Sequence, residues 1–105
     1  MKGNTNSTVE KSKSGGSGPI TWEQRGNTVT VHIRGYGVSA GGNQNVTTGL
    51  PIPAGTFNGG NLNFLVSEPN GANTCLFFIT YQGAMLYNSS YNMTIYGTVT
   101  YVTDA

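Results

Sequence analysis

The stretch from Ile20 to Arg34 constrains the fold of this chain more than any other feature of the sequence. It consists of two runs of alternating apolar and polar residues on either side of Gly26-Asn27. Glycine at the first position of a two-residue turn readily adopts the positive φ that tight hairpins require. Counting outward from this turn pairs Trp22 with Val31, Ile20 with Ile33, and Gln24 with Val29. Since opposite residues share a face, the stretch predicts a β-hairpin with one apolar and one polar side.

The remaining chain shows further short strands and turns, and no segment has the 3.6-residue apolar period of a helix. Asn70-Gly71 is a strong hairpin signal, and Gly35–Asn43 is expected to be a long glycine-rich connection. The run Leu76–Ile79 is apolar on both faces, which predicts a central strand or one covered by a partner. About six to eight short strands at regular spacing predict an all-β fold, a small antiparallel β-sandwich or barrel with a jelly-roll-like arrangement.

Composition divides the chain into two parts. Residues 1–19 are dominated by Ser, Gly, Asn, Thr and Lys, so they cannot bury enough apolar surface to fold and are expected to form a flexible linker or tether. Residues 20–105 are expected to form one small domain. In one predicted strand Leu62, Phe64 and Val66 are expected to face inward. In the last predicted strand Met93, Ile95, Val99 and Tyr101 are expected to share one face.

Charge is scarce, because charged residues make up 9% of the chain against about a quarter in ordinary soluble domains. Such a polar but uncharged surface suits a subunit of a permanent extracellular or virion-borne assembly. A formal net charge of +1 gives no basis for nucleic-acid binding. No apolar run is long enough to span a membrane, and no membrane insertion is expected. The single cysteine, Cys75, lies among apolar residues and is expected to be buried and unreactive.

The sequence contains no recognisable set of catalytic residues, and the chain is not expected to be an enzyme. Glycoside hydrolysis needs two carboxyl groups facing one cleft, whereas Glu23 and Glu68 are far apart in the sequence. A triad would have to use His32, the only histidine, and no Gly-x-Ser-x-Gly motif accompanies it. The pattern Gly35–Ala40 formally matches a dinucleotide-binding loop, but no helix follows it. No metal site and no cofactor are expected.

The segment Trp22–Val31 (Trp-Glu-Gln-Arg-Gly-Asn-Thr-Val-Thr-Val), followed by Thr48-Gly49-Leu50-Pro51, resembles the C-terminal head domains of phage tail fibres and baseplate receptor-binding proteins. Those of phages that infect Gram-positive bacteria, lactococcal phages above all, are the most similar. The resemblance covers about residues 20–53 and, more loosely, the final strand at Val99–Val102. Many members of that family carry a coiled-coil or collagen-like stem, where this chain has only the Ser/Gly-rich tract.

The resemblance implies a homotrimeric β-barrel head that binds a host cell-surface or cell-wall saccharide. It implies location on the virion, at the phage tail tip or baseplate, after assembly in the bacterial host cytoplasm. Other tail or baseplate proteins are expected to contact the N-terminal segment. The saccharide-contacting residues of the family lie in variable loops, so no binding residue is carried over from it.

Candidate binding residues come instead from composition, since Tyr and Asn bind hydroxyl-rich ligands at low entropic cost. Those in or near expected turns, together with one histidine on the polar hairpin face, are Tyr36, Asn70, Asn73, Tyr87, Tyr91 and His32. Each Asn also has a structural role available, because Asn stabilises turns. Tyr87 and Tyr91 are expected to be exposed around Asn88-Ser89-Ser90. Trp22 is favoured as a core residue over a sugar-stacking platform.

Two alternatives to the saccharide-binding head remain open. One is a purely structural trimeric virion module, such as a cap or a capsid-like jelly roll without a ligand. The other, less supported, is a glycan depolymerase. Binding to intact host cell walls separates the head from the structural module, and release of reducing ends would identify the depolymerase.

Overall fold

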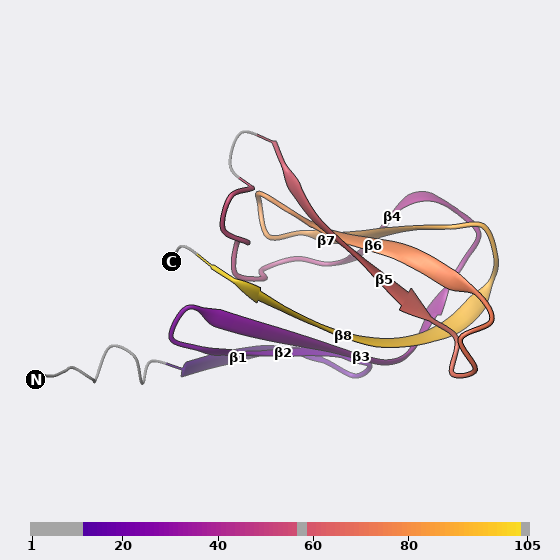
Figure 1. The fold of residues 1–105 in the computed structure, drawn as a ribbon, viewed down its shortest axis with the longest axis horizontal. Coiled ribbons are helices and arrows are strands. Elements are labelled where there is room, and N and C mark those ends of the chain that lie inside the picture. Colours follow the sequence, from indigo (N-terminus) through magenta and orange to yellow (C-terminus); the bar gives the residue numbers. More distant parts are fainter. Residues whose placement is uncertain (1–11, 57–58, 104–105) are drawn as a thin grey trace, which may run out of the picture.

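The computed structural model describes residues 12–56 and 59–103, and within these ranges the chain forms antiparallel strands and no helix. The strands are β1 (Ser12–Ser17), β2 (Ile20–Arg25), β3 (Thr28–Val38), β4 (Gly41–Thr47), β5 (Asn61–Ser67), β6 (Thr74–Thr80), β7 (Met85–Ser89) and β8 (Met93–Val102). They form one sheet in the order β1-β2-β3-β8-β5-β6-β7-β4. This sheet curls so that its two halves face each other (Figure 1). The prediction of a small all-β sandwich or barrel is confirmed.

Strand pairing from β3 onward is nested. The hairpin β5–β6 lies innermost, β4 pairs with β7 around it, and β3 pairs with β8 around both. A long antiparallel ribbon folded over itself produces this pattern, which is the arrangement found in jelly rolls. The two halves join where β5 meets β8, through the single register pair Ser67 and Tyr96.

The predicted hairpin is present as β2 and β3, with Trp22 opposite Val31, Ile20 opposite Ile33 and Gln24 opposite Val29. Gly26 has φ 57°, the left-handed conformation expected at the first turn position. The buried Gln24 side chain also stabilises the turn, because its Nε2 donates a hydrogen bond of 2.8 Å to the Gly26 carbonyl. Turn chemistry and alternation together therefore set this register.

The structure differs from the sequence prediction at the N-terminal linker. Residues 1–11 lie outside the described residues, but Ser12–Ser17 form β1 and pair along the full length of β2. Gly15 allows this polar strand to lie beside β2 and under the Trp22 side chain. A Cβ atom at Gly15 would lie 2.7 Å from the Trp22 indole, so only glycine lets this ring pack over the edge strand. Trp22 is half-buried and packs against the core, as expected.

The expectation of a long connection over Gly35–Asn43 is wrong. β3 continues to Val38, and β4 begins at Gly41. The ladder between β3 and β8 shifts register between Arg34 and Tyr36, and Gly35 between them has φ 78°. Glycine adopts this conformation without steric cost, so the strand passes through a β-bulge and does not end there.

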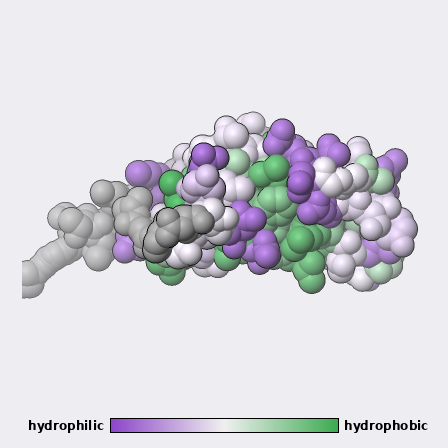
Figure 2. Space-filling model, turned by 90° about the horizontal axis from the view of Figure 1, so that it is seen from above, coloured by the Kyte–Doolittle hydropathy of each residue, from purple (hydrophilic) through white to green (hydrophobic). Residues whose placement is uncertain are grey.

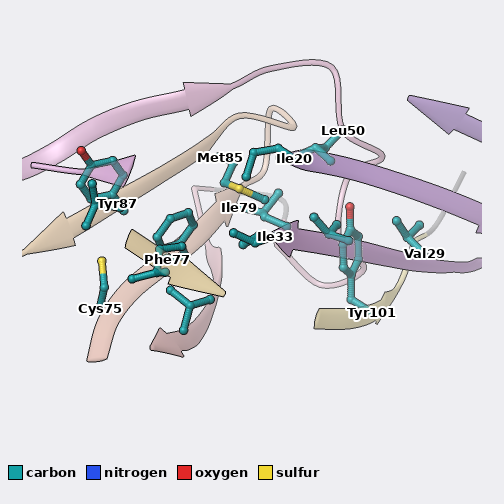
Figure 3. Close-up of a cluster of buried hydrophobic side chains, with 14 of the residues drawn as sticks. Ile20, Val29, Ile33, Leu50, Cys75, Phe77, Ile79, Met85, Tyr87 and Tyr101 are labelled. Atoms are coloured by element: carbon teal, nitrogen blue, oxygen red, sulfur yellow. The ribbon is translucent and has the colours of Figure 1, made fainter. Parts of the chain in front are cut away.

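The core lies between the two halves of the sheet and consists of inward-facing apolar side chains from both (Figure 3). Phe77 of β6 is fully buried, with its ring centroid 5.4 Å from that of Tyr87 and 5.9 Å from that of Phe64. Cys75 is buried as predicted, and burial raises the pKa of its thiol. The inward positions predicted for β5 and β8 are also confirmed, since Val66, Met93, Ile95 and Tyr101 are buried and Leu62, Phe64 and Val99 pack against the core.

The segment between β4 and β5 closes one end of the core. Leu50 is buried, and its N–H donates to the Gly83 carbonyl at 3.0 Å. The Tyr101 hydroxyl donates to the Pro51 carbonyl at 2.8 Å, and Thr103 Oγ1 donates to the Ile52 carbonyl at 2.7 Å. The proline-flanked stretch is thus held to the end of β8 by hydrogen bonds to its carbonyls, which proline retains.

Substituting Gly97 tests the junction between the two halves. A Cβ atom at Gly97 in β8 would lie 2.7 Å from Val66 Cγ1, so Gly97→Ala should overpack the junction and lower the free energy of unfolding by about 1–3 kcal/mol. Gly37→Ala is the matched control, because a Cβ there meets no atom within 4 Å. Urea denaturation measures both variants. Equal stabilities would show that β5 and β8 are not this close.

Tyr101 should make stability depend on pH at alkaline pH. Burial raises the pKa of Tyr101 from 10.0 to about 12, so the protonated form is favoured in the folded state. This contribution is fully present below pH 10 and should be lost as the pH rises from 10 to about 12. Tyr101→Phe should have a shallower decline in unfolding free energy over this window in urea titrations. An unchanged slope would contradict the assignment.

Candidate functional site

The outer face of the half formed by β4 to β7 carries a groove of about 520 Å³. Side chains alternate along each strand, so the residues flanking the buried Phe77 and Ile79 on β6 point to this outer side. The groove is lined by Leu76, Phe78 and Thr80 of β6, Leu86 and Asn88 of β7, Asn61 and Asn63 of β5, and Asn43 of β4. Figure 2 looks onto the molecule from above and shows a hydrophobic area flanked by hydrophilic residues.

Strand register orders these residues into rows that cross the groove. Asn63 lies opposite Phe78, Phe78 opposite Leu86, and Leu86 opposite Asn45, which lies next to the groove but is not part of its lining. Each row position is about 4.8 Å from the next, the spacing of hydrogen-bonded strands. An amide on β5, two apolar groups in the centre and an amide on β4 therefore follow one another in a line. The neighbouring row places Leu76 beside Asn88.

The apolar floor explains the run Leu76–Ile79, which is hydrophobic on both faces. β6 lies between β5 and β7, so the prediction of a central strand is confirmed. Phe78 faces outward but is only 9% exposed. Leu76 and Leu86 beside it are half-buried. The floor is thus a packed apolar surface that a ligand can contact from one side.

The groove has one rim on β5 and another on β4 and β7, and the asparagine side chains of the two rims differ in their hydrogen bonds. On the β4–β7 side, Asn88 Oδ1 accepts a hydrogen bond from the backbone N–H of Asn43, which itself has φ 53°. On the β5 side, Asn61 and Asn63 are exposed, and within the described residues no protein group is hydrogen-bonded to their side chains. Each free amide offers two donors and one acceptor oxygen to a ligand.

Among the described residues that line this groove, none carries a charge. Its polar groups are carboxamides and one hydroxyl, and its floor is hydrocarbon. None of these side chains transfers protons near neutral pH, so the groove is suited to binding rather than to acid–base chemistry.

Of the tyrosines predicted as binding residues, Tyr87 is a buried core residue and Tyr36 is partly buried against the core. Tyr36 lies in β3 and packs edge-on against Phe77 and Tyr87, with ring centroids 6.3 Å away in both cases. Burial, together with the neighbouring Tyr87 hydroxyl, raises the pKa of Tyr36. The expectation that Tyr87 is exposed is wrong, because it is 5% exposed in β7 and its ring stacks on Phe77 (Figure 3). Its hydroxyl accepts a hydrogen bond of 2.9 Å from the Ser39 N–H.

Asn70 and Asn73 lie in the β5–β6 turn and stabilise it. Asn70 Oδ1 accepts from the Ala72 N–H at 2.9 Å, which is an Asx-turn. Asn73 Nδ2 donates to Glu68 Oε1 at 2.8 Å, and the Glu68 N–H donates to the Asn73 carbonyl. Tyr91 is exposed at the turn between β7 and β8, as predicted, but it does not line the groove.

His32 lies on the outer face of the other half of the sheet, with its Nε2 3.8 Å from Glu23 Oε2. Near it, a smaller hollow of about 220 Å³ at the β1–β2 edge is lined by Ser12, Lys13, Ser14, Glu23, Gln24 and Arg25. The residues that line this hollow are all polar or charged. Over the described ranges, no group of three or more His, Cys, Asp or Glu side chains is placed to hold a metal ion.

The groove residues Asn43, Asn61 and Asn63 were not predicted as binding residues from the sequence, and Asn88 was expected only as part of a turn. The sequence does indicate that Asn61 and Asn63 face outward, because they alternate with the inward residues Leu62 and Phe64. That alternation places them outward but does not reveal which strands lie beside them. Their position next to Phe78 and Leu86 depends on the order of the sheet.

Comparison of the sequence with models of known protein families finds no match, and a search of curated proteins finds no significant relative. In the described part of the chain, no helix is long and apolar enough to cross a membrane.

Proposed function

We propose that this chain is a non-catalytic saccharide-binding head and that the groove over β4 to β7 is its binding site. The observation that carries the proposal is an apolar floor between two rims of carboxamides. A pyranose ring has an apolar face of C–H groups and a periphery of hydroxyls. The floor matches this face, and the amides supply both donors and acceptors for the hydroxyls.

The resemblance of Trp22–Val31 and Thr48–Pro51 to phage receptor-binding heads supports the biological setting. In this proposal the head lies at a phage tail tip or baseplate and attaches the virion to a glycan on the host surface. The N-terminal segment joins it to other tail proteins. Attachment requires binding without bond cleavage, which agrees with a groove that contains no titratable side chain.

A structural module is the second candidate, and one observation favours it. Leu65 of β5, opposite Leu76, is 67% exposed, and Tyr96 of β8 is also exposed near the junction of the two halves. Exposed apolar side chains of this size often mark subunit contacts. Leu65 and Tyr96 do not line the groove themselves, but Leu65 lies opposite the floor residue Leu76, so a subunit contact at Leu65 would border the groove.

The free amides of the β5 rim provide the direct test of saccharide binding. Asn61→Ala combined with Asn63→Ala removes two ligand-facing amides and should weaken binding to host cell walls about tenfold or more, at about 1 kcal/mol per lost hydrogen bond. Both residues are exposed, so the fold should be unaffected. Thr98→Ala, on the outer face of the other half, is the control. Unchanged wall binding by the double variant would refute the proposed site.

Assembly is expected to be homotrimeric. The domain carries few charges and exposes Leu65, Tyr96 and Val102 outside the groove, so partner subunits would cover surface that is costly to leave in water. Three linked heads would also raise avidity for a repeating glycan. Multi-angle light scattering should give three times the chain mass of 11.1 kDa. A stable monomer at micromolar concentration would contradict this expectation.

A further inference from the structure

Charge is distributed unevenly between the two halves of the sheet. Among the described residues, the cationic side chains of Lys13, Arg25 and Arg34 belong to β1, β2 and β3. The acidic side chain of Glu23 is on β2. Glu68, in the loop after β5, is already hydrogen-bonded to Asn73. The strands β4 to β7 carry no charged residue at all.

From this distribution we infer that the groove selects uncharged glycans and discriminates against anionic cell-surface polymers, such as those containing phosphodiesters. The inference rests on the proposed function and specifies its ligand class. Bacterial surface polymers include both kinds, so the distinction determines which one the head recognises.

The physical basis is the cost of removing a charge from water. A phosphate placed on an apolar floor loses hydration, and it recovers this free energy only if cations or charge-assisted hydrogen bonds replace the water. The groove offers neutral amides and Thr80, and no cation among its lining residues. A sugar hydroxyl loses much less hydration, and one or two amide hydrogen bonds compensate for it.

Position 63 allows this selectivity to be tested with a matched pair of variants. Asn63 is exposed on the rim opposite Phe78, so both Asn63→Asp and Asn63→Lys should fold normally. Asn63→Asp keeps the size of the side chain and adds a negative charge. Asn63→Lys adds a positive charge at the same place.

Cell walls of Gram-positive hosts that bind the wild-type full chain serve as probes, and the phosphate-free polysaccharide that hydrofluoric acid releases from them by cleaving phosphodiesters serves as a soluble competitor. With a neutral ligand, this phosphate-free polysaccharide should compete with the walls for the chain, and Kd should change less than about twofold between about 50 and 500 mM NaCl. Asn63→Asp and Asn63→Lys should both weaken binding, because each loses the amide.

The opposite pattern would overturn the inference. With an anionic ligand, the phosphate-free polysaccharide would not compete, binding would weaken with salt, and Asn63→Lys would bind more tightly than wild type while Asn63→Asp would bind more weakly. This failure is distinguishable from failure of the proposed function. If no untreated wall binds the wild-type chain, the saccharide-binding role itself is refuted.

Discussion

Packing of Phe77 and its neighbours between the two halves of the curled sheet is the contact on which the other features of this domain depend. β6 is central in its half, and its inward side chains Cys75, Phe77 and Ile79 are buried. Because side chains on a strand alternate between faces, burying these three forces Leu76, Phe78 and Thr80 to the outer side. A one-residue slip would exchange the two sets. The core therefore determines the floor of the groove as well as the stability of the fold.

The distribution of polar groups follows from the same constraint. On β5, the inward Leu62, Phe64 and Val66 leave Asn61 and Asn63 outside, and pairing with β6 brings these amides to the apolar floor. The other half of the sheet has an outer face of threonines and charged side chains, with Thr30 hydrogen-bonded to Thr100 at 3.2 Å. The two outer faces are thus chemically distinct, and the β4–β7 face combines apolar and uncharged polar groups in a groove.

Local features of the structure were predictable from sequence, and non-local ones were not. The β2–β3 register followed from the Gly26-Asn27 turn and the alternation around it, both contained in one short stretch. β1 was missed because its position depends on the open edge of β2 and on the fit of Gly15 beneath Trp22, which composition does not reveal. Tyr87 was misplaced because its burial depends on β7 lying between β6 and β4. The groove escaped prediction for the same reason, since its residues come from strands that are adjacent only in the folded sheet.

The central claim is that a saccharide binds over β4 to β7 and not at the loops. Heteronuclear NMR tests it directly, because the side-chain NH2 groups of asparagine give their own signals. Titration of the labelled full chain with soluble fragments of a host cell-wall saccharide should shift the side-chain signals of Asn61, Asn63 and Asn88 and the backbone signals around Phe78 and Leu86. Shifts confined to the Asn70–Asn73 turn, to Tyr91 or to the outer face around His32 would contradict the claim.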